Sequence, residues 1–405
     1  MRKIRALPVF RHRWFEDSPT GNGASPRDRC RESLASVNAS QQMRAGATKE
    51  GKLIPVPSFK RRPPAFAVRV TYCFVLDYLI APVVRKLERS DRILKVLGAE
   101  TRRRLSRSIT KNPFRGYTPG EQDVFVMTYP KSGQNWMLQI AYQLIHHGKG
   151  DFDHIHSVVP WPDVVLATRT WRNYAIPLRL ATAWRTAPEP KRLIKTHLNW
   201  ELLPYSKEAR YIAVIRDPKD VFVSFYFFAR NNLLGRAMPS VSAVYRSFLQ
   251  GESLIGSWAI NAAGYWAQSL RPNVLVVSFA SMKRDLEATV RQVAEFLEIR
   301  VSDEVIREVC RKSSFDYMKS IDERFAPFQG APWRSKAFML RSGEQGASSA
   351  LLTPQQQREI DAVFTAELQK LRLRCSLRRN LRIHKGRIAN DSLNPRLEVA
   401  TSGPL

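Results

Sequence analysis

The sequence predicts an α/β fold: a three-layer sandwich in which a mainly parallel central sheet is flanked by helices. From residue 117 onward, short apolar runs typical of buried strands alternate with apolar stripes at helical spacing. The first strand is joined to its helix by a turn of small residues, and three strands end in polar side chains. Ligands of open α/β sheets bind beyond the carboxyl ends of the strands, so we expect the functional site there.

The first strand, turn and helix predict a P-loop-like phosphate-binding turn. Val124–Met127 is a continuous apolar run that ends at Tyr129-Pro130, because proline cannot donate to a sheet ladder. Lys131-Ser132-Gly133 then forms a tight turn, and the apolar stripe from Trp136 to Ile145 predicts a helix. Free backbone N–H groups, a lysine and a hydroxyl thus meet at a helix N-terminus, where phosphate is favoured. The strict motif G-x-x-x-x-G-K-[ST] is not matched, since the lysine precedes the glycine.

The remaining elements follow the same alternation. Further strands are predicted at Arg192–His197, Tyr211–Ile215 and Asn273–Val277, and helices at 221–230, 262–268, around 286–297 and around 305–309. Thr353-Pro354-Gln355-Gln356 has the cap residue, first-turn proline and glutamine of a helix start. The helix that begins there is expected to bury Ile360, Val363, Phe364 and Leu368.

Charge divides the 405 residues into regions. Residues 1–116 carry roughly 26 basic and 9 acidic side chains, and residues 370–405 roughly 9 and 2, whereas the middle is nearly balanced. We therefore predict a basic, disordered extension at 1–62, a basic helical segment at 63–116, the main α/β domain at 117–370 and a basic tail at 371–405.

The apolar run from Ala65 to Val84 contains Arg69, Asp77 and Pro82, and central charges are rare in a membrane span. We interpret it as one amphipathic helix or two short elements, with a membrane-surface helix as the alternative. The chain shows no pattern typical of a secretory signal, and its four cysteines have no metal or disulfide spacing. We expect a cytoplasmic protein, peripheral to a membrane if its basic ends make weak contact with anionic lipid.

Two segments resemble those of the cytosolic-type sulfotransferases, which use 3′-phosphoadenylyl sulfate (PAPS). The order T-Y-P-K-S-G-x-x-W from Thr128 to Trp136 resembles the family's 5′-phosphosulfate loop. The segment Arg216–Ser224 resembles its 3′-phosphate signature, R-[ND]-P-K-D-x-x-V-S. Arg216 at a strand end offers a planar fork to a phosphate, and Ser224 in the next helix is placed to turn back toward it.

Further segments add to the resemblance, which covers residues from about 117 to 370. Lys195-Thr196-His197-Leu198 resembles the K-T-H-L segment, whose histidine is the family's base; histidine titrates in the useful range. Phe338–Gly346 resembles the R-K-G-x-x-G lid, with Ser342 in place of lysine. The resemblance implies catalytic roles for Lys131, Lys195 and His197. It implies donor binding by Lys131, Ser132, Gly133, Gln134, Asn135, Trp136, Arg216, Ser224, Phe279, Ser314, Arg341, Ser342 and Gly343.

The implied activity is transfer of a sulfuryl group from PAPS to a hydroxyl, or an amine, of a small acceptor that we expect to be apolar. No metal is expected, because the nearby histidines 146, 147, 154 and 156 lack a cysteine or carboxylate set to complete a site. Two alternatives stay open: a P-loop nucleotide kinase, and a non-enzymatic basic protein that binds membrane or nucleic acid. For the enzyme we expect a small-molecule acceptor and no specific nucleic acid. The oligomeric state is left open, with a homodimer as one alternative.

Overall fold

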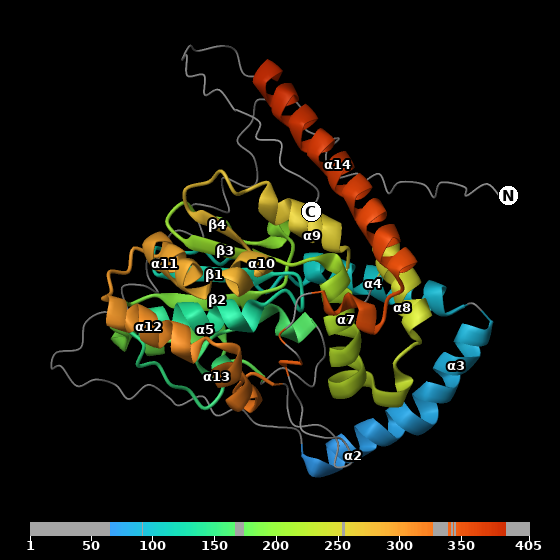
Figure 1. The fold of residues 1–405 in the computed structure, drawn as a ribbon. Coiled ribbons are helices and arrows are strands. Elements are labelled where there is room, and N and C mark those ends of the chain that lie inside the picture. Colours follow the sequence, from blue (N-terminus) through green and yellow to red (C-terminus); the bar gives the residue numbers. More distant parts are fainter. Residues whose placement is uncertain are drawn as a thin grey trace. The chain divides into compact units, whose positions relative to one another are not determined.

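The computed structural model describes residues 65–90, 92–166, 174–252, 256–326, 339–341, 343 and 346–385, and Figure 1 shows the fold. Four parallel strands form one sheet in the order β2-β1-β3-β4. They are β1 (Asp123–Thr128), β2 (Arg192–Thr196), β3 (Arg210–Ile215) and β4 (Val274–Ser278). All four strands were predicted from their apolar runs. The predicted extension at 1–62 and residues 386–405 of the predicted tail lie outside the described residues.

The sheet is covered on both faces, which confirms the three-layer prediction. Alternate residues of β1 point to opposite sides. Val124 and Val126 pack in a cluster with α5 (Gln134–Ile145), α11 (Leu286–Phe296) and α12 (Asp303–Lys312). Phe125 and Met127 pack in a second cluster with Tyr265 of α9 (Trp258–Trp266). In Figure 1, α5 and α12 lie below the sheet and α9 above it.

A third cluster packs the helices beside the sheet. It joins α7 (Pro218–Phe228), α8 (Val241–Leu249), α9 and α14 (Pro354–Lys385). The predicted start of α14 is confirmed: the Thr353 backbone N–H donates to Gln356 Oε1 at 2.9 Å, and the Gln356 N–H donates to Thr353 Oγ1 at 3.2 Å. Ile360 and Phe364 are buried as predicted.

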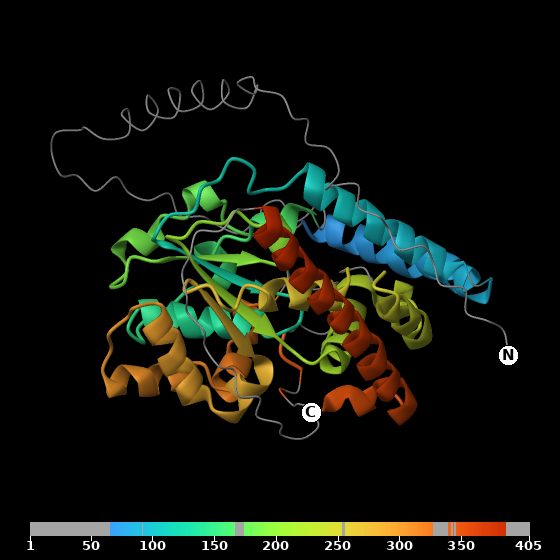
Figure 2. The ribbon, with the colours of Figure 1, turned by 90° about the horizontal axis from the view of Figure 1, so that it is seen from above.

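The basic segment before the domain is helical. Phe66–Arg89 forms one helical run of α2 (Phe66–Phe74), the π-helical turn η1 (Val75–Ile80) and α3 (Ala81–Arg89), and α4 (Ile93–Thr110) follows. In Figure 2, α3 and α4 lie next to each other. The run is therefore one element, the first of the two forms that we predicted.

The other elements are short. They are α6 (Ile155–Val158), η2 (Pro162–Leu166), η4 (Leu178–Leu180), η5 (Ala183–Thr186), η6 (Trp200–Leu202), η7 (Ala229–Leu234), η8 (Gly235–Ala237), α10 (Phe279–Arg284), α13 (Phe315–Ser320), η9 (Asp322–Arg324) and η10 (Ala347–Ala350). The carboxyl ends of β1, β2 and β3 meet at one edge of the sheet, because Val126 pairs with both Lys195 and Ile212. This register brings the three predicted site segments together.

Candidate active site

The turn after β1 is held in an unusual backbone conformation. Lys131 has φ 72° and Gly133 has φ 97°, both in the left-handed region that favours glycine. The Ser132 N–H donates to the Tyr129 carbonyl at 3.2 Å and closes the turn. A Cβ atom at Gly133 would lie 2.7 Å from the Phe279 ring, so residue 133 must be glycine for the turn to approach α10 this closely.

This turn leaves polar groups available for an anion. Gly133 is the N-cap of α5, and among the described residues no side chain caps the first-turn N–H groups. The Ser132 hydroxyl is 1% exposed and has no hydrogen-bond partner in the described part of the chain. A buried hydroxyl beside free N–H groups at a helix N-terminus has the chemistry of a phosphate cradle.

The side-chain amide of Gln134 binds backbone carbonyls of the sheet and does not face the anion site. Its Nε2 donates to the carbonyls of Val126 at 2.7 Å and Thr196 at 2.9 Å, so it links the ends of β1 and β2. Within this arrangement Gln134 offers an anion only its backbone N–H. Asn135 instead faces the site, since its Oδ1 accepts from Lys195 Nζ at 3.4 Å.

Arg216 lies at the end of β3, against the same turn. Its Nη1 donates to the Lys131 carbonyl at 3.2 Å, its Nη2 is 3.6 Å from Asp220, and its guanidinium lies 4.2 Å from the Phe279 ring centre. Its buried Nε has no partner among the described residues. Burial is the main cause that lowers the pKa of Arg216. The guanidinium thus has a donor left for an anion at the second predicted phosphate position.

Aromatic rings separate the turn from the C-terminal helices. The Trp136 and Phe279 rings meet edge to face with centres 5.4 Å apart, and Trp136 Nε1 donates to the Ser313 carbonyl at 2.7 Å. Ser314 Oγ accepts from the Tyr317 N–H at 3.2 Å and caps α13. Phe279 and Trp136 thus form a wall next to Arg216, where the resemblance expects an adenine.

Lys195 is 3% exposed and points from β2 toward the turn. Its Nζ is 3.1 Å from His156 Nε2 and 4.0 Å from the Trp161 ring centre. His156 Nδ1 faces the Val159 carbonyl at 3.3 Å, so Nδ1 carries the proton and Nε2 accepts from the ammonium. Burial lowers the pKa of Lys195 to about 7.

His197 follows β2 with its ring orientation set by backbone. Its Nδ1 lies 2.9 Å from the Thr128 carbonyl, which only accepts, so Nδ1 holds the proton and Nε2 presents a lone pair. The His197 N–H donates to Asp163 Oδ2 at 3.0 Å, and the Trp161 ring packs edge to face against the imidazole. Burial, and then the nearby Lys195 charge, lower the pKa of His197 to about 3. The imidazole is therefore neutral at physiological pH.

Lys131 completes a group of cations. Its Nζ is 3.5 Å from the Met339 carbonyl and 4.3 Å from the Phe228 ring centre. Burial, and then the charge of Arg216, lower its pKa to about 8. Lys195 is buried beside the half-buried Lys131 and Arg216. The charge of Arg216 lowers the pKa of Lys131, and the charge of Lys131 lowers that of Lys195, which is the electrostatic condition of a polyanion site.

The predicted lid contacts the site through Arg341. Its guanidinium lies 5.0 Å from the Phe227 ring centre, and its charge contributes to lowering the pKa of Arg216. The Gly346 N–H donates to Asp220 Oδ2 at 3.3 Å, and Asp220 also faces Arg216. Gly343 has φ 66°, and Ser342 lies outside the described residues. Ser224 is half-buried within α7, the helix that follows Arg216.

The four histidines between residues 146 and 156 lie in different environments. His146 packs on Tyr142, His147 Nε2 faces Glu189 at 3.0 Å, and His154 Nε2 faces the Ala326 carbonyl at 3.0 Å. Within the described ranges no group of three histidine, cysteine or acidic side chains is placed to hold a metal ion. The absence of a metal cofactor stays a prediction.

His156 and Asp163 were not assigned to the site from the sequence, and Trp161 was expected only as one of several aromatics that flank it. His156 contacts Lys195, Trp161 packs between Lys195 and His197, and Asp163 accepts from the His197 backbone. Asp163 is a lone acid inside the apolar stretch Val158–Leu166, and such an acid is buried only when its hydrogen bonds are satisfied. That pattern is the signal that could have identified it.

Comparison with known proteins agrees with this geometry. The family model described as "Sulfotransferase domain" matches residues 121–372. The chain is 29% identical over 255 residues to sulfotransferase 2A1 of Homo sapiens, covering 62% of this chain and 86% of that protein. It is 27% identical over 252 residues to the 3-beta-hydroxysteroid sulfotransferase of Cavia porcellus, covering 61% and 84%.

Solved structures share the fold. The crystal structure of retinol dehydratase in complex with androsterone and inactive cofactor PAP matches with a TM-score of 0.53 and 18% identity, covering 62% of this chain and 82% of that one. A second crystal structure of retinol dehydratase, in a complex with retinol and PAP, matches with a TM-score of 0.52 and 18% identity, covering 62% of this chain and 83% of that one. At this identity the likeness concerns the fold alone.

Proposed function

This chain belongs to the sulfotransferase family, and from that premise we propose that it transfers a sulfuryl group from PAPS to a small apolar alcohol. One observation supports the proposal most strongly: Lys131, Lys195, Arg216 and the neutral His197 gather at the carboxyl edge of one parallel sheet. A P-loop kinase is disfavoured by the family and by the turn, in which the lysine precedes the glycine.

The residues present fit PAPS. The unpartnered Ser132 hydroxyl, the first-turn N–H groups of α5 and Lys131 would hold the 5′-phosphosulfate. Arg216, with its unpartnered Nε, would hold the 3′-phosphate with Ser224 and Arg341. Phe279 and Trp136 would pack on the adenine, with Ser314 at the same wall. When bound, PAPS supplies the sulfuryl group and leaves as PAP.

Residues of this chain would accept the proton of the acceptor hydroxyl and stabilise the negative charge on the leaving phosphate. The bond from sulfur to the bridging phosphate oxygen breaks as the acceptor oxygen bonds to sulfur, and His197 Nε2 takes the hydroxyl proton. Lys131 and the N-terminus of α5 stabilise the negative charge that develops on the phosphate oxygen. Lys195 shares this work, since Asn135 and His156 hold its Nζ beside the turn.

The acceptor is expected to be apolar. Trp161 lies against His197, and Phe228 lies against Lys131, so aromatic rings flank the reacting position. Phe225 and Phe325 are core residues, whereas Trp171 and Phe328 lie outside the described residues. The relative named for 3-beta-hydroxysteroids supports a sterol-like alcohol, handled in the cytoplasm. The predicted membrane contact through the basic ends falls mainly on residues that are not described and stays a prediction.

A direct assay tests the proposal. The purified chain is incubated with labelled PAPS and a panel of phenols, sterols, lipid-like alcohols and glycans, and we expect label in an apolar product. The His197→Ala variant should lose turnover yet bind PAP nearly as tightly as the wild type. A melting temperature raised by ATP and not by PAP would contradict the assignment in favour of a kinase. Loss of PAP binding in His197→Ala would show that His197 is not the base.

A further inference from the structure

The helical run Phe66–Arg89 presents apolar side chains to the outside. By length and composition alone it could cross a membrane, and only 17% of its most apolar window is buried. Its large exposed residues range from 41% to 67% exposed; they are Phe66, Val68, Tyr72, Phe74, Tyr78, Leu79, Ile80 and Val83. Contiguous apolar surface of this kind marks a contact with another molecule or a membrane.

Three charged side chains of the run, those of Asp77, Arg85 and Glu88, contact the catalytic domain, whereas Lys86 and Arg89 near its end are exposed. Arg85 Nη2 donates to the carbonyls of Met238 at 3.0 Å and Arg236 at 3.1 Å. Glu88 accepts from the Ser240 N–H at 2.5 Å, and Asp77 accepts from the Arg236 N–H at 3.3 Å. A helix at a water-exposed surface has the reverse arrangement, with charges outward and apolar residues inward.

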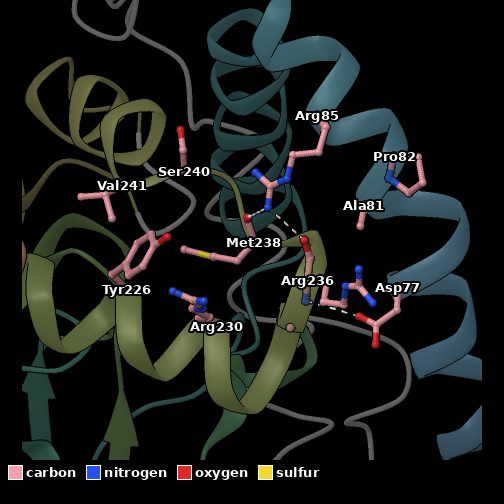
Figure 3. Close-up of a pocket in the computed structure, with 11 residues that line it drawn as sticks. Asp77, Ala81, Pro82, Arg85, Tyr226, Arg230, Arg236, Met238, Ser240 and Val241 are labelled. Carbon is pink, nitrogen blue, oxygen red and sulfur yellow. Dashed lines mark hydrogen bonds between the residues drawn. The ribbon is translucent and has the colours of Figure 1, made fainter.

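A basic cavity lies between the run and the domain. It has a volume of about 560 Å³ and is lined by Arg85, Arg230 and Arg236, with one acid, Asp77. Figure 3 shows the arginines reaching into it from α3, η7 and η8. Arg85 is paired with Glu88 at 2.6 Å, which leaves the guanidinium groups of Arg230 and Arg236 to attract an anion, and arginine suits phosphate in particular.

We propose that the run docks the enzyme on an anionic phospholipid bilayer. Its apolar face lies among the acyl chains, and the arginine cavity on its domain side lies at the depth of the lipid phosphates. The contacts to the domain extend from Tyr72 to Glu88, along most of the run, so the helix lies in the plane of the interface and does not cross the bilayer.

The charge of the protein favours an anionic bilayer, and not a second copy of the chain, as the partner that covers the run. The formal net charge is +29, and the end of the run carries Lys86 and Arg89, so two copies would repel each other while anionic lipid would be attracted. The proposed membrane-binding run is also close to the candidate active site. It contacts η7, which continues α7, and the Phe228 ring of α7 contacts Lys131. If the proposed function holds, an apolar alcohol dissolved in lipid lies near the site.

Vesicle flotation of the full chain tests the dock. The probes are phosphatidylcholine vesicles with and without 30 mol% phosphatidylglycerol (about one lipid in three, a strongly anionic surface). The test variant is Phe74→Asp with Leu79→Asp. Its matched control is Trp266→Asp with Leu270→Asp, which places the same charges on exposed residues, 59% and 80% exposed, outside the run. Arg230→Gln with Arg236→Gln tests the cavity.

We expect the wild type and the control to float with anionic vesicles and the Phe74/Leu79 variant to stay behind. The arginine variant should lose affinity for anionic vesicles about fivefold or more per arginine, but keep its weak binding to neutral ones. Flotation of the Phe74/Leu79 variant like the wild type would overturn the proposal. So would a lipid-free dimer that this variant converts to a monomer. Vesicle binding is measured without PAPS or acceptor. A failure to bind vesicles is therefore distinguishable from a failure of the proposed sulfotransferase activity.

Discussion

Two apolar helices of this chain lie in opposite surroundings. α5 buries nearly every residue from Gln134 to Ile145 between the sheet and α12. The run Phe66–Arg89 is similarly rich in apolar residues, yet it leaves eight large apolar side chains exposed while Asp77, Arg85 and Glu88 contact the domain. Hydrophobicity predicts that a helix forms, but the neighbours that cover it decide whether its apolar residues form core or contact surface.

The largest expected effect separates these helices by stability. Ile140→Asp places an unpaired charge in the core and should lower the free energy of unfolding by more than about 4 kcal/mol. Leu79→Asp, on the exposed side of η1, should change it by less than about 0.5 kcal/mol. Urea denaturation measures both. An equal decrease in the free energy of unfolding for both variants would mean that another part of the chain covers the run.

The second prediction concerns the ends of the two helices. Lys131→Ala removes the ammonium at the N-terminus of α5 and should lower kcat by about 10²–10³-fold, because the developing phosphate charge loses its partner. Arg89→Ala at the end of the run should leave kcat with a water-soluble acceptor unchanged. A rate for Lys131→Ala within a few-fold of the wild type would remove this lysine from the mechanism.

The third prediction uses the lowered lysine pKa values. In the free protein the pKa is about 8 for Lys131 and about 7 for Lys195, and the phosphates of PAP should raise both. Binding therefore takes up protons, and PAP affinity should fall as pH rises through 7 to 9, by up to about tenfold per pH unit for each lysine. Calorimetry in buffers of different ionisation enthalpy measures the uptake. Affinity that stays constant across this window would contradict it, and near neutral pH Lys195→Met should remove the larger share of the proton uptake.

The smallest expected effect concerns the attachment of the run. Arg85→Gln removes the donors to the Met238 and Arg236 carbonyls. It should lower the free energy that holds the run on the domain by about 1 kcal/mol. The loss should appear as faster hydrogen exchange in Phe66–Arg89, with little change in α5. Exchange that accelerates equally in both helices would show that the run and the core unfold as one unit.

Local signals predicted much of the fold. The strands came from short apolar runs, and the start of α14 came from the reciprocal Thr353 and Gln356 side chains, because these features depend on residues close in sequence. The site segments were located because parallel strands place their carboxyl ends at one edge.

Other features depend on partners far along the chain. Gln134 was predicted to bind the donor, but its amide links Val126 to Thr196, a choice set by strand pairing. His156 was weighed as a metal ligand, yet it contacts Lys195, 39 residues away. The direction in which Arg85 and Asp77 point likewise depends on η8, which no periodicity of the run itself reveals.

The backbone at Lys131 has a consequence for evolution and engineering. A lysine with φ 72° carries about 1 kcal/mol of strain that glycine would relieve, and its buried ammonium adds a desolvation penalty. Lys131→Gly should therefore be more stable than the wild type, but its kcat should be lower by about 10²–10³-fold. Screens that reward thermal tolerance alone would select against the very side chain on which the chemistry depends.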